Sequence, residues 1–339
     1  MKTLKRICLI LFVSIAAFAM FACEAGNNGK LVNENASFDT VIYGTYAQNR
    51  VTDGNLTGLL KGLGESAWSD NRTTYNDTVY ERVVAAPFSK QAKFNDGGAI
   101  TEGETYYFAV MPVEWYVLEN NEDSTALIAK NILDVQVFNT NVDRAPDNDG
   151  KYVNDWELST LREWLNGTFL NKAFTALESA AINKTKNVSA YPESYYKNHS
   201  KAINDTWDQV YCLSYADAVN ADNRYNHTYA FSSAMGDYDC LRMAKVTDYA
   251  KARGAWYYIN TQKEDYKDYE LYQRFDGNGK YWLRTVGKDS VYAAVVRYTG
   301  EVGRTYENVG YKYSKDAKST VDVGVRPAIT VGFDATVGK

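Results

Sequence analysis

The region from residue 281 onward constrains the fold most strongly, because two apolar runs there enclose a long polar segment. The first run is Tyr281–Thr285 and the second is Gly324–Ile329. Both hold the aromatic and β-branched residues that are typical of buried strands. The segment between them is rich in Tyr, Arg and Lys; Tyr and Arg are enriched at binding surfaces. The sequence therefore predicts a packed frame that displays a binding surface.

Strand alternation assigns roles within this region. If Val291, Ala293 and Val295 face the core, then Tyr292, Ala294, Val296 and Tyr298 face outward, unless a bulge near Arg297 shifts the pattern by one residue. We expect the following residues to contact a ligand: Lys288, Asp289, Tyr292, Arg297, Tyr298, Glu301, Arg304, Tyr306, Tyr311 and Tyr313. The alternative is that the tyrosine rings cover the core and point only their hydroxyls to water. Arg284 and Arg326 lie inside the frame, and we expect both to bond to loop carbonyls.

The N-terminus predicts export and a lipid anchor. Lys2, Lys5 and Arg6 precede the uncharged run Ile7–Ala22, which is too short for a membrane span but suits a signal peptide. A small residue followed by Cys23 resembles a bacterial lipobox, so residues 1–22 would be removed and Cys23 would carry the lipid, palmitate included. Ordinary secretion with cleavage near this position is the alternative. Residues 23–37 are polar and predict a flexible tether.

Charge and cysteine content limit the partners and cofactors. Removal of residues 1–22 deletes three positive charges and changes the net charge from −5 to −8, which argues against nucleic-acid binding. Cys212 and Cys240 could form a disulfide in an oxidising compartment, or remain two separate buried thiols. Since only two histidines accompany these thiols, the sequence predicts no metal centre and no cofactor.

Two helices are predicted in the middle of the chain. The first, Ser159–Phe169, would begin at a capping box formed by Thr160 and Glu163 and end at Gly167. The second, Asn171–Asn183, carries apolar residues at helical spacing. Together with short strands elsewhere they indicate an α+β fold in which the helices flank antiparallel strands joined by long irregular loops.

Several motifs in order resemble a known domain family. Val41–Gln48, Trp115–Glu119, Ser159–Asn166, Trp282–Thr285 and Gly324–Ala328 resemble a family of unassigned function that is common in bacterial surface proteins. The resemblance covers about residues 38–333. That family is similar to the C-type lectin fold, in the branch shared with formylglycine-generating enzyme. With its lipobox and C-terminus, the chain looks most like the Treponema variable protein A family of lipoproteins, which diversity-generating retroelements diversify.

The resemblance implies a single lectin-like domain over residues 38–339, with a variable region at about 280–330. It implies a monomer on the bacterial surface, anchored in the outer membrane, that binds an unknown protein or glycan of another cell or host. Two other functions remain open: an envelope-structural lipoprotein with a fixed protein partner, and a divergent enzyme on the same fold. The enzyme is disfavoured because no cysteine follows Cys240, whereas formylglycine-generating enzyme needs a C-terminal pair. No catalytic residue is therefore predicted.

Overall fold

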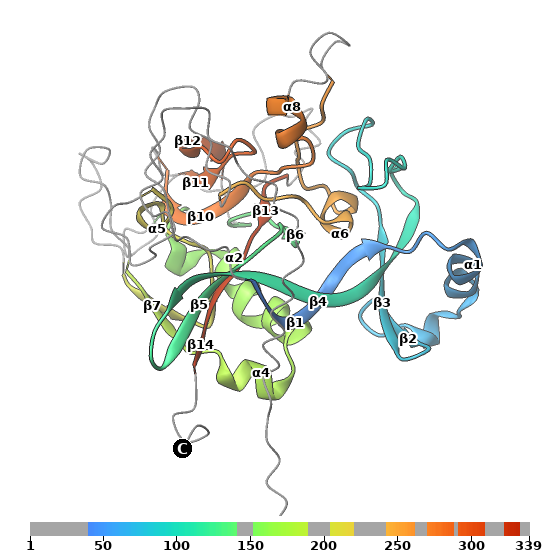
Figure 1. Ribbon diagram of the computed structural model, residues 1–339, viewed down its shortest axis with the longest axis horizontal. Coiled ribbons are helices and arrows are strands. Elements are labelled where there is room, and N and C mark those ends of the chain that lie inside the picture. Colours follow the sequence, from blue (N-terminus) through green and yellow to red (C-terminus); the bar gives the residue numbers. More distant parts are fainter. Residues whose placement is uncertain are drawn as a thin grey trace, which may run out of the picture.

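The computed structural model describes residues 40–140, 152–188, 204–219, 242–261, 270–287, 291–308 and 322–332. Within them the chain is mixed α and β, with more strands than helices and with open sheets (Figure 1). The strands are β1 Thr40–Arg50, β2 Arg72–Tyr75, β3 Thr78–Val84, β4 Thr105–Asn120, β5 Ser124–Ala129, β6 Asp134–Val135, β7 Thr185–Asn187, β8 Thr206–Asp208, β9 Val210–Tyr211, β10 Tyr281–Val286, β11 Tyr292–Val296, β12 Val302–Asn308, β13 Gly324–Val325 and β14 Ala328–Gly332. The helices are α1 Gly54–Gly62, α2 Thr160–Trp164, α3 Leu170–Ala173, α4 Ala176–Ala181, α5 Tyr215–Val219, α6 Asp248–Ala252 and α8 Glu270–Phe275, with 3-10 turns at Glu65–Ala67 and Trp156–Leu158 and a π turn at Leu165–Phe169.

The larger sheet has seven strands in the order β2-β3-β4-β5-β14-β9, and β1 pairs with β4 beside this path. All of its pairings are antiparallel. β4 is 16 residues long, so it pairs with β3 near its start, with β1 along its middle and with β5 at its end. The expectation of uniformly short strands is therefore wrong for β1 and β4. Since β1 pairs with β4, β4 with β5 and β5 with β14, the first and last described strands of the chain lie in one sheet.

The smaller sheet has five strands in the order β12-β11-β10-β13-β6. Its strand β11, second from one edge, contradicts the predicted alternation, because Ala294 and Val296 are as fully buried as Ala293 and Val295. The register shifts opposite Ala293–Val295 and not near Arg297. Since β11 lies between β10 and β12 and is covered on both faces, it is a continuous apolar run without an outward face.

The first predicted helix does not stop at Gly167. It begins at Ser159, whose hydroxyl accepts a hydrogen bond from the Arg162 amide at 3.3 Å, and it continues as a π turn into α3. Leu165 and Phe169 in the π turn are fully buried. The free energy gained by burying these two side chains exceeds the roughly 1 kcal/mol by which Gly167 destabilises a helix.

The second predicted helix is shorter than expected. It begins at Thr175, which forms a capping box with Glu178, and ends after Ala181. The capping box predicted for Thr160 and Glu163 is not formed, because the Thr160 hydroxyl instead accepts a hydrogen bond from the Thr140 amide. The Thr-x-x-Glu pattern thus forms a capping box at the start of α4 and not at the start of α2.

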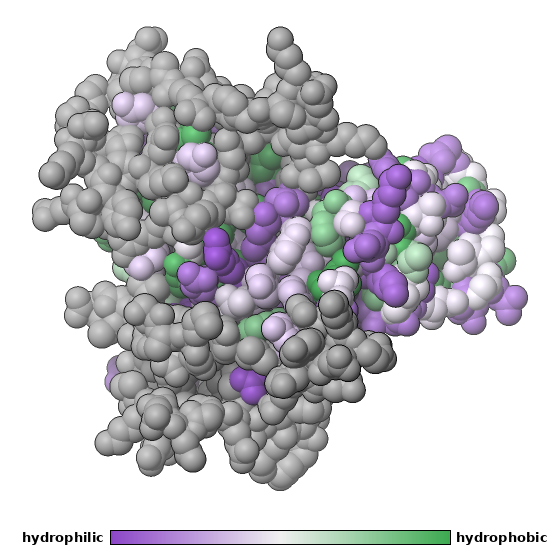
Figure 2. All heavy atoms as spheres, turned by 90° about the horizontal axis from the view of Figure 1, so that it is seen from above, coloured by the Kyte–Doolittle hydropathy of each residue, from purple (hydrophilic) through white to green (hydrophobic). Residues whose placement is uncertain are grey.

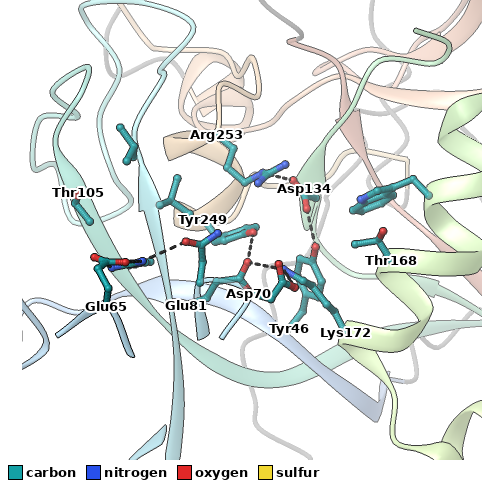
Figure 3. A pocket seen from close by; sticks show the side chains of 15 residues that line it. Tyr46, Glu65, Asp70, Glu81, Thr105, Asp134, Thr168, Lys172, Tyr249 and Arg253 are labelled. Carbon is teal, nitrogen blue, oxygen red and sulfur yellow. Dashed lines mark hydrogen bonds and ion pairs between the residues drawn. The ribbon is translucent and has the colours of Figure 1, made fainter. Parts of the chain in front are cut away.

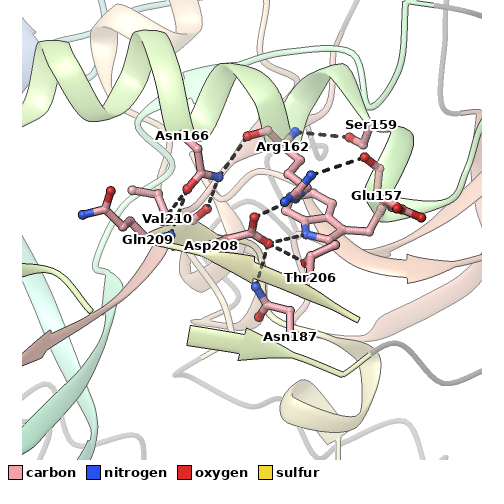
Figure 4. A network of polar contacts seen from close by, with 10 residues as sticks. Glu157, Ser159, Arg162, Asn166, Asn187, Thr206, Asp208, Gln209 and Val210 are labelled. Atoms are coloured by element: carbon pink, nitrogen blue, oxygen red, sulfur yellow. Dashed lines mark hydrogen bonds and ion pairs between the residues drawn. The ribbon is translucent and has the colours of Figure 1, made fainter. Parts of the chain in front are cut away.

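A buried carboxylate fastens the α2–α3 helix to β8 (Figure 4). Asp208 Oδ1 lies 2.6 Å from Arg162 Nε, and Asp208 Oδ2 accepts hydrogen bonds from Trp156, Asn187 and Thr206 at 2.6–3.0 Å. Because a buried carboxylate needs this many donors to replace water, the network fixes the helix position. The helix in turn forms one wall of the cleft described below.

One hydrophobic core joins both sheets. Trp115 of β4, Trp156, Phe169 and Trp282 of β10 are all almost completely buried in it. A small second cluster of Leu60, with Tyr80 and Tyr107, packs α1 against β3 and β4. In the part of the chain that the structure describes, no helix is both long and apolar enough to cross a membrane.

Candidate functional site

We call the surface formed by the predicted contact residues, from Lys288 to Tyr313, the C-terminal face. Its described part is the hairpin between β11 and β12. Arg297 and Glu301 stand at its turn, with side chains 37% and 53% exposed, and they form a weak ion pair at 3.4 Å. The turn is fixed from below by Arg242, whose buried guanidinium donates to the Gly300 carbonyl at 2.9 Å. The Asn278 amide donates to the Tyr298 carbonyl at 3.2 Å. Two core side chains therefore hold the backbone of this turn in place.

Tyr298 is part of an aromatic cluster beside this turn. Its ring stacks on Tyr258 at 4.9 Å between centroids, and it meets Phe275 and Trp256 at 5.5 Å. Phe275 is buried, whereas the other three rings are partly exposed. Tyr298 thus has both roles that were considered for the tyrosines: one side covers the core, and part of the ring faces outward.

The other predicted contact residues are placed as follows. Tyr292 begins β11, is partly buried and packs against the core. Arg304 and Tyr306 belong to β12, of which only the backbone is described at these positions. Four predicted contact residues lie outside the described residues: Lys288, Asp289, Tyr311 and Tyr313. The structure therefore brings Arg297, Tyr298 and Glu301 together at one turn and leaves Tyr292 at the opposite end of β11.

The two frame arginines are structural, as predicted. Arg284 is 5% exposed and donates to the Cys212 carbonyl and to Asp217 Oδ2, at 2.9 and 2.8 Å. Arg326 is 1% exposed and donates to the Ala129 carbonyl at 2.7 Å. These bonds tie the two apolar runs of the C-terminal region to neighbouring strands and loops.

The cysteines are only partly described. Cys212 is a free, fully buried thiol, and burial raises its pKa to about 12. Cys240 and the lipobox Cys23 lie outside the described residues. The bond between Cys212 and Cys240 and the lipidation of Cys23 stay predictions.

A polar cleft of about 670 Å³ lies away from the C-terminal face, where the larger sheet meets the α2–α3 helix and α6 (Figure 3). Its lining residues come from segments far apart in the chain: Tyr46, Glu65, Asp70, Asn71, Glu81, Arg82, Val83, Val84, Thr105, Asp134, Trp164, Thr168, Lys172, Tyr249 and Arg253. On the face of the molecule seen in Figure 2, hydrophilic residues are spread over the neighbouring lobe that carries α1. The cleft thus has a mostly polar lining.

Asp134 is the centre of one half of the cleft. Its side chain is 2% exposed, and its Oδ1 lies 2.6 Å from Arg253 Nε. Its Oδ2 accepts a hydrogen bond of 2.6 Å from the Tyr46 hydroxyl. The Val135 amide donates to Oδ1 at 2.7 Å. Both carboxylate oxygens are therefore occupied by protein donors.

Glu81 is the centre of the other half. Its side chain is 3% exposed, and its Oε1 accepts from the Tyr249 hydroxyl at 2.7 Å and lies 3.2 Å from Lys172 Nζ. Arg72 Nε lies 2.8 Å from Oε2. Lys172 also reaches Asp70 Oδ2 at 3.0 Å. This carboxylate, like Asp134, has no unoccupied oxygen.

The two tyrosines connect these halves. The Tyr46 and Tyr249 rings meet edge to face, 5.7 Å apart. Burial, followed by the Asp134 carboxylate, raises the pKa of both hydroxyls well above the usual value, so both remain proton donors. The Asp134 carboxylate also raises the pKa of Arg253, which keeps the guanidinium charged.

One helix stripe and one glycine shape the wall of the cleft. Trp164, Thr168 and Lys172 are four residues apart and all line the cleft. Residues four apart drift by about 40° around a regular α-helix, and the wider π turn between them reduces this drift. Gly44 of β1 has φ +65°, and a Cβ there would lie 2.6 Å from both the Ala173 carbonyl and the Phe174 ring. Only glycine lets the helix approach the strand this closely.

No short motif in the sequence predicts the cleft. Its carboxylates are separated by more than fifty residues, so no local motif joins them. A signal was nevertheless present, since Asp134 interrupts the apolar stretch Ile132–Val135 and Glu81 interrupts the apolar strand around Val79–Val83. A charged residue at an inward strand position needs buried partners and so marks a polar site.

Comparison with known proteins places the chain in a family without assigning it a function. The family described as "Domain of unknown function (DUF6273)" matches residues 122–332. No curated protein and no solved structure matches the chain. The matched region begins after β4 and includes Asp134, Lys172 and Arg253, while Tyr46 and Glu81 precede it. Because the match extends over more than half of the sequence, the protein belongs to this DUF6273 family of unknown function.

Proposed function

We propose that the protein is a lipid-anchored surface receptor that binds a protein or glycan without catalysis, through the turn and loops of its C-terminal Tyr/Arg-rich face. The observation that carries this proposal is that β10 and β11 are buried on both faces, with Ala293, Ala294 and Val295 at 0% exposure. Such strands form a rigid support that does not depend on the residues displayed at their ends. The surface can then change while the core stays the same.

The anchoring of the β11–β12 turn supports this proposal. Arg242 and Asn278 hold its backbone, while the side chains of Arg297 and Glu301 project into solvent. A backbone fixed before binding lowers the entropic cost of forming a complex. The partly exposed rings of Trp256, Tyr258 and Tyr298 lie beside the turn and offer an aromatic surface, in which Tyr258 and Tyr298 are stacked and Trp256 is inclined to Tyr298.

The same proposal includes a more specific fold, the site of the lipid anchor and the origin of variation in the C-terminal face. We assign a C-type-lectin-like fold, a bacterial outer-membrane anchor at Cys23, and diversification of the C-terminal face by a retroelement. The placement of β1 and β14 in one antiparallel sheet, with a helix packed on it and a second sheet carrying the loops, supports the fold. A fixed partner in the envelope is the second candidate, since the aromatic cluster would serve a constant interface equally well.

The proposal is tested first by sequencing the locus in a clonal population and its relatives. Substitutions confined to residues 286–313, together with a template repeat beside a reverse transcriptase gene, are the expected result. An invariant C-terminal face without a template repeat would contradict diversification and favour the fixed partner.

Binding itself is tested with the full-length chain in detergent on arrays of glycans and surface proteins. The double variant Arg297→Ala with Glu301→Ala should lose the signals of the wild type, because both exposed side chains of the turn are removed. The control is Lys61→Ala, an exposed residue of α1 on the opposite lobe. Equal signals from the double variant and the wild type would place the binding surface elsewhere.

A further inference from the structure

We propose that the cleft between the larger sheet, the α2–α3 helix and α6 is a second binding site, which takes a small polar organic acid and holds its carboxylate on Arg253. This site is separate from the C-terminal face and is independent of the function proposed for it. Its volume of about 670 Å³ falls within the usual range of small-molecule pockets.

The orientation of Arg253 is the first argument. The residue follows α6, its Nε pairs with Asp134, and its guanidinium lies over the Tyr249 ring at 5.5 Å. Its side chain remains 34% exposed and lines the cleft. The two terminal nitrogens make no bond to any described residue. A guanidinium fixed at Nε presents these nitrogens as a fork that matches a carboxylate.

The balance of donors and acceptors is the second argument. The oxygens of Asp134 and Glu81 are already occupied by Tyr46, Tyr249 and the neighbouring cations. The other two carboxylates of the lining are also paired, Glu65 with Arg82 and Asp70 with Lys172, so the Arg253 fork is the main charged group of the cleft that is left for a ligand. A ligand that supplies negatively charged oxygens would pair with this fork, whereas a cationic ligand would meet no unpaired carboxylate in the lining.

The uncharged residues of the cleft indicate what the ligand carries besides its carboxylate. Thr168, Thr105 and Asn71 are exposed polar residues at the cleft, and the partly buried Trp164 indole is an apolar surface among them. Hydroxyl and amide groups of this kind bond to a polar body, and an indole packs against its flatter, less polar side. Sugar acids and amino acids both combine a carboxylate with such a body.

The test uses the full-length chain in detergent and isothermal titration with glucuronate and glutamate, each at up to about 10 mM, with glucose as the neutral probe. We expect one or both acids to bind, and glucose not to bind. Glucuronate alone would identify a sugar acid, and glutamate alone an amino acid. Absence of binding by both acids would overturn the proposal, as would glucose binding as tightly as glucuronate.

Variants locate the site. Arg253→Lys keeps the charge but loses the fork, so affinity should fall by about tenfold or more. Arg50→Lys is the matched control, because Arg50 also pairs with an aspartate, Asp96, but lies outside the cleft. Thr168→Trp adds a bulky side chain at an exposed position of the cleft wall and should abolish binding even if Arg253→Lys folds poorly. Unchanged affinity in Thr168→Trp would overturn the assignment to this cleft.

The same titration separates this site from the C-terminal face. Arg297→Ala with Glu301→Ala should leave binding of the acid unchanged, because neither residue lines the cleft. Loss of acid binding in that double variant would show that the acid is bound at the C-terminal face instead.

Discussion

Arg253 Nε lies 2.6 Å from Asp134 Oδ1, and this ion pair joins the end of α6 to β6 across the wall of the cleft. Asp134 is 1% exposed, so its charge depends on protein donors in place of water. The pair therefore has two roles: it connects two elements of the core, and it orients the guanidinium toward the cleft.

Arg253→Met should lower the free energy of unfolding by about 2–3 kcal/mol, less than breaking a fully buried pair because Arg253 is partly solvated. The measurement is urea unfolding at pH 7. Arg82→Met is the comparison, since Arg82 pairs with the exposed Glu65 at the same cleft and its removal should change stability little. Equal losses in both variants would show that the burial of Asp134 does not govern the cost.

Gly44→Ala should destabilise the protein by more than about 1 kcal/mol, because φ is +65° and the new Cβ would meet the backbone of Ala173 and the Phe174 ring. Gly58→Ala is the matched control, since Gly58 lies inside α1 with open space around its Cβ position. That control should stabilise the protein by up to about 1 kcal/mol. Thermal unfolding of both variants measures the difference, and a neutral Gly44→Ala would refute the close approach of helix and strand.

The contrast between Gly44 and Gly167 shows what could be predicted from the sequence. The local propensity of glycine predicts a helix end at Gly167. The burial of Leu165 and Phe169 outweighs that propensity, and burial depends on partners that are distant in the chain. Gly44, whose tertiary role is larger, gave no signal because it sits in a well-formed strand pattern.

The candidate sites show the same limit. The frame around the C-terminal face could be predicted, because Trp282, Arg284 and Arg326 lie in short runs with strong strand character. The burial of both faces of β11 could not be predicted. Ala294 and Val296 are small or apolar residues that are compatible with either a covered or an exposed face, and the structure shows both to be buried. The cleft could not be predicted either, because Glu81, Asp134 and Arg253 meet only in the folded chain.

Between about pH 8 and 10, Lys251 should contribute a rise with pH to the free energy of unfolding, opposed by the buried Cys212 thiol, whose raised pKa makes stability fall with pH in the same window. Burial lowers the pKa of Lys251 to about 8, partly offset by the Asp248 and Asp276 carboxylates. The unfolded chain keeps this proton up to about pH 10.4, so in this window the unfolded state binds more protons at Lys251 and the contribution of this residue to stability increases with pH, by up to about 1.4 kcal/mol per pH unit.

Urea unfolding of wild type and Lys251→Met from pH 7.5 to 9.5 tests this prediction. Cys212 and the tyrosines of the unfolded chain begin to ionise within this range, so the rise due to Lys251 is measured as the difference between wild type and Lys251→Met. Lys251→Met should lose the rise, whereas Lys61→Met, at an exposed position of α1, should keep it. An unchanged rise in Lys251→Met would mean that another group releases the proton.

Cys212 should resist alkylation in the folded protein. The thiol is fully buried, and burial raises its pKa to about 12, so at pH 8 almost no thiolate is present to react. Iodoacetamide should therefore modify Cys212 only after unfolding in guanidinium, as read by mass spectrometry of the peptide that contains it. Because the structure shows a free thiol, this modification should need no reductant. If the unfolded chain is modified at Cys212 only after reduction, the thiol is bonded, and the disulfide with Cys240 becomes the better description of the exported protein.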